Sequence, residues 1–218
     1  RGLSRAHLGA ADQDHSIRAP WVQFPYSHRQ FAQRQVERTG DVTGLAVGQW
    51  FETAGEARWW FDSGSVAIDF ANTGSLPDNT EQLHSPSDLG AWLHDRLERV
   101  DTDPNERELS DALGLRAAIA SLALRAVHAQ QPNPSDIDIL NLFAAMPDVP
   151  PVLGGGTRQA GASRVRAGQA LSSIAREAIR ILGDDTVSRI RQCSADDCDL
   201  VYLDTSRSGN RRWCSMQR

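Results

Sequence analysis

The 218-residue sequence predicts a mainly α protein, in which a helical body precedes a small C-terminal module with short β-strands. Several segments begin with a capping residue, a proline and an acid, and continue with apolar residues at helical spacing. Two short alternating segments lie near the C-terminus, where all three cysteines are found. We therefore predict a poorly ordered N-terminal extension over 1–56, a helical domain over 57–187 and a cysteine module over 188–218.

The composition is that of an ordinary globular protein, with 40% hydrophobic and 23% charged residues. The longest apolar run, 117–124, is well short of the ~20 residues that cross a bilayer. Residues 1–18 lack the apolar centre of a secretory signal. We therefore expect a cytoplasmic protein, in which thiols stay reduced and clustered cysteines bind metal more often than they form disulfides.

Charge is distributed unevenly along the chain, whose net charge is −5. Residues 51–188 carry 11 Arg against 20 acids, whereas residues 189–218 carry 6 Arg against 4 acids. A basic terminus on an acidic body favours a local contact with an anionic partner. All 23 basic residues are arginine, which excludes a P-loop lysine and a pyridoxal-phosphate anchor.

The first ordered element is expected after residue 56, because 1–56 shows no sustained hydrophobic period and only a weak helical segment at Ser27–Glu37. The segment "RWWFDSGSVAIDFANTG", 58–74, favours either a strand and a turn or the first turns of a helix, and its periodicity leaves both open. Its core candidates are Phe61, Val66, Ile68 and Phe70.

Three polar residues stand among these apolar ones: Asp69, Asn72 and Thr73. They are candidates for lining a ligand pocket in the helical domain, which would then sense an effector. The favoured interpretation is local capping or hydrogen bonding, because short polar side chains commonly bond to nearby backbone groups.

Three helices follow, and the same signature predicts the start of each: a capping residue, then proline, then an acid at the third helical position. The capping residues are Ser85, Asp103 and Asn133. The second of these helices is the longest, and its predicted apolar face includes Leu109, Leu113, Ile119, Leu122 and Val127.

Residues 147–167 are predicted to form a loop with a short hairpin turning at Gly154–Gly156. A last long helix follows over 168–185, with Leu171, Ile174, Ala178, Ile179 and Leu182 on its buried side. Residues 187–193 and 199–204 then alternate as short strands on either side of the first cysteine pair.

The cysteines have the spacing of a metal site. Cys193 and Cys198 bracket the turn-prone "SADD", and Cys214 lies beyond a further strand and loop. Structural zinc sites take four protein ligands, in local pairs, so Cys214 would need a partner just beyond it. A distant histidine is an alternative fourth ligand, although all six lie at or before His128. Three idle thiols remain the other alternative, and the C-x4-C spacing disfavours a redox pair.

These residues resemble a known family. "CSADDCDLVYLDTSRSGNRRWCSM" is similar to the CGNR-type zinc finger, whose pattern runs C-x4-C, F/Y-x-D-x-S-R and R-R-W-C-S-M before C-G-N-R. "FDSGSVAIDFANTGS" is similar to the opening of the ABATE domain, a helical domain that usually precedes this finger and is described as a proposed stress-induced transcriptional regulator.

The resemblance implies a zinc ribbon-like finger that uses Cys193, Cys198, Cys214 and a fourth cysteine. The match ends at Arg218, one residue before that cysteine would fall, so we expect the finger to be incomplete in this sequence. The resemblance also implies a transcriptional regulator whose finger contacts DNA. We expect the helical domain to sense an effector or to form a homodimer.

Candidate DNA-binding residues are the arginines that lead into and past Cys214: Arg207, Arg211, Arg212 and Arg218. Trp213 is expected to pack beneath the metal site rather than to stack on a base. The alternative is a zinc-stabilised module that binds another protein and does not bind DNA. An enzyme is not expected, because H-E-x-x-H and G-x-S-x-G are absent and "GGGTRQAG" fits neither a P-loop nor a dinucleotide motif.

Overall fold

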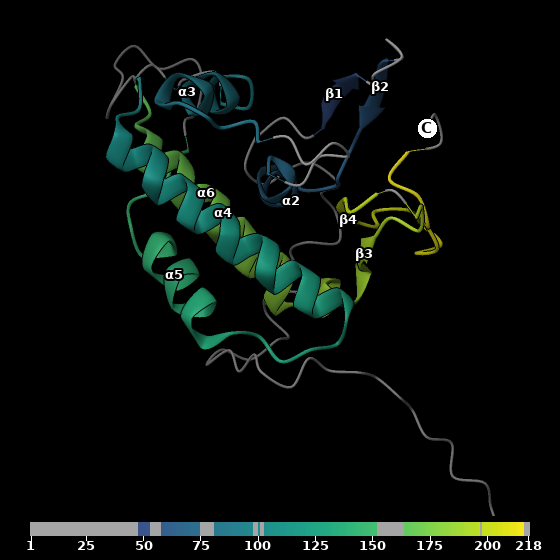
Figure 1. The fold of residues 1–218 in the computed structure, drawn as a ribbon. Coiled ribbons are helices and arrows are strands. Elements are labelled where there is room, and N and C mark those ends of the chain that lie inside the picture. Colours follow the sequence, from purple (N-terminus) through teal and green to yellow (C-terminus); the bar gives the residue numbers. More distant parts are fainter. Residues whose placement is uncertain are drawn as a thin grey trace, which may run out of the picture.

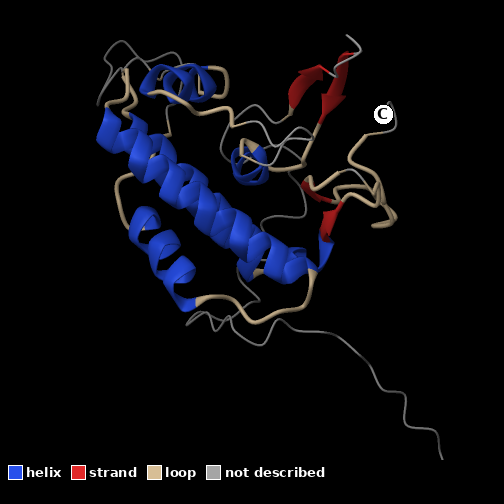
Figure 2. Cartoon of the chain, in the orientation of Figure 1, coloured by secondary structure: helices blue, strands red, loops and turns tan. Residues whose placement is uncertain are grey.

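The computed structural model describes residues 48–52, 58–74, 81–97, 100, 103–151, 164–196 and 198–215. These residues form a mainly helical fold with two short antiparallel strand pairs along one side (Figure 2), which confirms the predicted fold class. The helix predicted at Ser27–Glu37 and the hairpin predicted at Gly154–Gly156 lie outside the described residues. None of the described helices has the length and hydropathy needed to span a membrane.

The helical body consists of α2 to α6. In Figure 1 the long helix α4 lies in front of α6, and α5 packs against both of them. The short helix α2 lies between α4 and the strands, in contact with both α4 and α6. The bounds are α2 (Val66–Asn72), α3 (Pro86–His94), α4 (Glu106–Val127), α5 (Pro134–Ala144) and α6 (Ala167–Gly183), with the 3₁₀ helix η1 (Asp185–Arg189) after α6.

Large apolar side chains fill the space between these helices, and each fully buried one stabilises the fold by about 1.5–3 kcal/mol relative to an exposed position. The predicted core candidates of residues 58–74 are all among the buried residues. The largest fully buried side chains of α4 and α6 are Leu115, Ile119, Leu171, Ile174 and Ile181.

The helix starts follow the predicted capping logic at two of three sites. Ser85 caps α3 in a reciprocal box with Asp88, and Asn133 caps α5. The predicted cap at Asp103 is wrong, because α4 begins two residues later, with Asn105 as its cap. Asn105 accepts bonds from the backbone of the first turn, and the Glu108 carboxylate accepts the Asn105 N–H at 3.0 Å. Asn105 and Glu108, three residues apart, therefore form a capping box at the start of α4.

The strands form two separate pairs. β1 (Gln49–Glu52) pairs with β2 (Arg58–Phe61), and β3 (Ile190–Gln192) pairs with β4 (Val201–Leu203). The two C-terminal strands confirm the prediction for that region. Segment 58–74 contains both of the structures left open for it, a strand up to Phe61 and then α2. Most of the predicted N-terminal extension lies outside the described residues, but its last part includes β1, so ordered structure reaches further toward the N-terminus than expected.

Candidate metal centre

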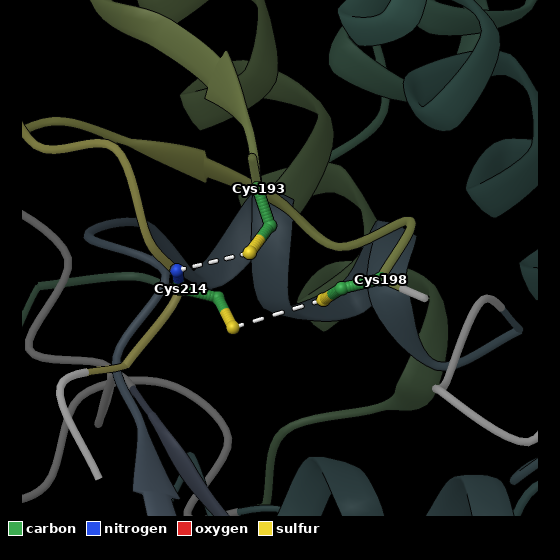
Figure 3. Close-up of side chains that lie close together, drawn as sticks. All are labelled: Cys193, Cys198 and Cys214. Carbon is green, nitrogen blue, oxygen red and sulfur yellow. Dashed lines mark hydrogen bonds between the residues drawn. The ribbon is translucent and has the colours of Figure 1, made fainter. Parts of the chain in front are cut away.

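The three cysteines predicted as ligands lie together. Their sulfur atoms are all within 4.8 Å of one another, all three residues are buried, and none forms a disulfide. Figure 3 shows Cys193 at the end of β3, with its Sγ directed toward the same space as those of Cys198 and Cys214. Among the described residues, no histidine belongs to this group of three cysteines.

The geometry fits a tetrahedral thiolate site for zinc. Bonds of about 2.3 Å place tetrahedral sulfur ligands about 3.8 Å apart. The Sγ atoms of Cys198 and Cys214 are 3.7 Å apart. The Cys214 N–H points at the Cys193 Sγ, 3.4 Å away, as backbone amides do when they support a metal-bound thiolate. Zinc, when bound, would be held by these three residues and would stabilise the loops around it.

Electrostatics also favour a cation at this position. The hydrogen bond with Cys198 raises the pKa of the Cys214 thiol, and burial and the nearby Cys193 act in the same direction. Three thiolates at these distances repel one another unless a cation lies between them. The site is therefore suited to a bound metal ion and unsuited to isolated reactive thiols.

Short-range backbone bonds place each ligand in the finger, by which we mean residues 189–215. Cys193 directly follows β3, and its N–H donates to the Leu200 carbonyl at 2.9 Å. The next N–H, that of Ser194, donates to the Arg212 carbonyl at 2.9 Å and joins the two cysteine loops. A turn bond from the Cys198 N–H to the Ala195 carbonyl brings the second ligand back toward the first.

A small core lies beside the cysteines, and it includes Phe61 from β2 as well as Leu200 and Tyr202. Burial raises the pKa of Tyr202 to about 12, so its phenol stays protonated and donates to the Arg211 carbonyl at 2.7 Å. The prediction that Trp213 packs beneath the site is wrong: its side chain is 43% exposed. Phe61, far away in sequence, is instead buried in the same cluster as the three cysteines.

The predicted DNA-binding arginines have different surroundings. Arg207 and Arg212 are exposed on the loop that leads to Cys214. Arg211 is half-buried and its guanidinium donates to backbone carbonyls of Asp62, Trp213 and Cys214. Arg218 lies outside the described residues. Two of the four arginines are therefore placed to meet a partner, and a third is occupied within the protein.

Asp204 was not singled out from the sequence, yet it organises the arginine loop. It is fully buried and accepts the N–H groups of Ser206 and Arg211, both at 2.9 Å. Burial alone would raise the pKa of this carboxyl, but the hydrogen bonds from Ser206 and Arg211 outweigh burial and lower it. The signal that could have found it is the F/Y-x-D pattern, in which Tyr202 and Asp204 both bind the backbone of Arg211.

The helical body holds the three pocket candidates, which the structure places on α2 and just after it. Asp69 is fully buried and accepts the Gly48 N–H at 2.6 Å. Burial raises the pKa of Asp69 to about 6, against the lowering effects of the Ser63 side chain, the Gly48 N–H and the Arg96 guanidinium. Its other oxygen, Oδ1, has no hydrogen-bond partner among the described residues, and the same holds for the buried indole nitrogen of Trp92.

Asn72 and Thr73 have structural partners. The Asn72 amide donates to the Val201 carbonyl at 2.8 Å and accepts the Val201 N–H at 3.2 Å, which links α2 to β4. The Thr73 hydroxyl donates to the Phe70 carbonyl at 2.8 Å and accepts a bond from Arg116. Only Asp69, of the three, keeps a buried oxygen without a described partner.

Comparisons with known proteins match two families to successive parts of the chain. Residues 64–185 match the ABATE family, described as "Putative stress-induced transcription regulator", and residues 189–218 match the CGNR zinc finger. No curated protein matches the chain. The finger match runs to the last residue of the sequence, so the expected incompleteness of the finger stays a prediction. Since the first match covers more than half of the chain and the second covers the cysteine centre, the chain belongs to the ABATE family and carries a CGNR zinc finger.

Proposed function

We propose that the chain is a transcriptional regulator, and not an enzyme, whose zinc-holding finger contacts DNA. The observation that carries this proposal is the exposure of Arg207 and Arg212 on a loop whose end is fixed by the buried Cys214. Phosphate contacts by arginine supply much of the affinity of DNA-binding proteins, and a rigid platform lowers the entropy lost when they form. The excess of basic over acidic residues in 189–218 supports an anionic partner.

Metal content is the first test. Elemental analysis of the purified protein should return about one zinc per chain. Zinc prefers the soft thiolate ligands that this cluster provides. A protein that is folded and free of zinc would contradict the proposal.

DNA binding is the second test, and it uses the two exposed arginines. Arg207→Ala combined with Arg212→Ala should weaken binding to duplex DNA and reduce the slope of log affinity against log salt by about 2. The matched control is Arg107→Ala combined with Arg180→Ala, which removes the same charge from exposed positions of α4 and α6. Equal losses in both double variants would indicate a general charge effect and would count against a finger contact.

A protein-docking module is the alternative function, and the exposed Trp213 is the observation that favours it. Exposed tryptophans often anchor protein contacts. Under this alternative, Trp213→Ala abolishes partner binding, the affinity changes little with salt, and the arginine double variant behaves like its control.

For the helical body we propose effector sensing at Asp69, supported by its buried, unpartnered oxygen. A buried polar atom without a partner is costly and is often completed by a ligand or an ordered water. A thermal-shift panel of small amines, amides and carboxylic acids should contain compounds that stabilise the wild type and leave Asp69→Asn unaffected. Dimerisation is the other proposed role of the body, and sedimentation velocity over a range of concentrations tests it.

A further inference from the structure

The guanidinium of Arg211 lies between the metal site and the helical body. Its Nε donates to the Trp213 carbonyl at 2.9 Å and its Nη2 donates to the Cys214 carbonyl. Arg211 therefore binds the backbone on which the predicted ligand Cys214 lies. Its Nη1 donates to the carbonyl of Asp62 at 3.0 Å, in the connection between β2 and α2. The same group lies 4.3 Å from the centre of the Tyr202 ring. One side chain thus connects a metal ligand with the start of the helical body.

Two further contacts join the same parts of the molecule. The Leu203 N–H donates to the Ser63 carbonyl at 2.7 Å, and the buried Asn72 amide pairs with both backbone groups of Val201. Gly64 lies against this joint with φ +77°, and a Cβ there would stand 2.5 Å from the Leu203 carbonyl oxygen. The backbones of these two segments therefore approach so closely that only glycine fits at position 64.

The contribution of Phe61 shows that the finger is not a self-contained unit. Phe61 is fully buried in the cluster that contains all three cysteines. Both Phe61 and Asp62 precede residue 64, where the helical-domain match begins, and they lie far from the finger match at 189–218. Residues outside both matched ranges thus complete the surroundings of the metal site.

We propose that Arg211 is a positioning residue for Cys214, and that it and Asn72 couple metal binding by the finger to the stability of α2. This inference rests on the proposed zinc site. Metal binding orders the Cys214 loop, which fixes the carbonyls that Arg211 holds, and Arg211 then fixes Asp62 at the entrance to α2. Because coupling is reciprocal, the docked helical body raises the metal affinity of the finger by the same factor.

The variant test measures zinc affinity by competition with a chromophoric chelator and reads the coordination geometry from the spectrum of the cobalt-substituted protein. Arg211→Ala should lower the affinity by about 10–100-fold, the range found for residues that support metal ligands. Arg211→Lys should show nearly the same loss, because lysine keeps the charge but cannot hold three carbonyls. Arg212→Ala is the matched control, with the same charge removed from the next, exposed residue, and should keep wild-type affinity.

A second measurement needs no variant. Hydrogen exchange of the wild-type protein with and without zinc should show slower exchange in Val66–Asn72 and at the Val201 and Leu203 amides when metal is bound. Protection confined to the cysteine loops would overturn the coupling, as would an Arg211→Ala variant with unchanged zinc affinity. A wild-type protein that binds no zinc at all would instead overturn the proposed function on which the inference rests.

Discussion

The helical body and the finger are stabilised by different means. The body buries a continuous set of apolar side chains from α2, α3, α4, α5 and α6, and side chains cap the starts of α3, α4 and α5. The finger has two strands of three residues each and a small core made of the cysteines, Phe61, Leu200 and Tyr202. So small a core needs additional stabilisation, as small domains generally do. A metal ion bound by the cysteines would be one source. The joint with α2 is another, and there Ile190, Val201 and Leu203 pack into the core of the helical body.

The largest effect is expected from removing a metal ligand. Cys193→Ser should lower zinc affinity by more than about 100-fold, because the hydroxyl is a poor replacement for a soft thiolate. Far-UV circular dichroism should show that the helices persist, since their core does not contain the metal. The exposed Ser194→Ala is the neighbouring control and should bind zinc normally. Loss of the helical signal in Cys193→Ser would mean that the body also depends on metal for its folding.

The next largest effect is expected on the stability of the helical body. Leu115→Ala removes a fully buried side chain of α4 and should lower the free energy of unfolding by about 3 kcal/mol. Urea denaturation measures this loss, and Leu142→Ala, at a position 67% exposed, should change it by less than about 0.5 kcal/mol. Similar losses for the two variants would contradict the placement of the core.

The joint between the two regions should have a smaller effect. Asn72→Ala leaves the buried N–H and carbonyl of Val201 without their partner, which costs about 2 kcal/mol of stability. Urea denaturation of the zinc-bound protein measures it, with the exposed Asn141→Ala of α5 as control. If Asn72→Ala were as stable as the control, α2 and β4 would not be joined through this side chain.

The smallest effect is expected on how the stability of the helical body depends on pH. The folded pKa of Asp69 is about 6 and its reference value is 3.8, so the folded state binds a proton more readily than the unfolded state between these values. Stability should therefore rise as pH falls from about 7 toward 4, and the cost of the buried charge is fully present above pH 6. Asp69→Asn should raise stability at pH 8 by about 2 kcal/mol and flatten this dependence. Thermal unfolding across pH tests it, with the exposed Asp138→Asn expected to keep the wild-type profile.

Local sequence signals predicted much of the fold. The caps at Ser85 and Asn133 were found because a capping residue and the turn that it caps are neighbours in the chain. The grouping of the three cysteines followed from their spacing in the same way. The start of α4 was missed by two residues because Asp103 and Asn105 both suit a cap and each has a glutamate three residues on, so the local signal does not separate them.

The remaining features depend on contacts between residues far apart in sequence. Nothing near Arg211 indicates that Asp62 will accept its hydrogen bond, and nothing near Asn72 indicates Val201. The same reason explains the error at Trp213, which was expected to be buried because it lies next to Cys214 in the chain. Trp213 is exposed, and Phe61, far away in sequence, is buried with the cysteines. Residue type identified the polar and aromatic candidates, whereas tertiary packing determined which of them support the metal site.

The position of Phe61 has a practical consequence for cutting this protein into parts. A peptide that spans only 189–218 would retain the three cysteines and lose the Phe61 ring that is buried with them. It would also lose the Asp62 carbonyl that binds Arg211 and the Asn72 amide that binds Val201. Such a peptide would expose Tyr202 and Leu200 to water on the side that Phe61 covers. Studies of the finger in isolation would therefore underestimate its metal affinity, and a minimal functional unit has to begin before residue 61.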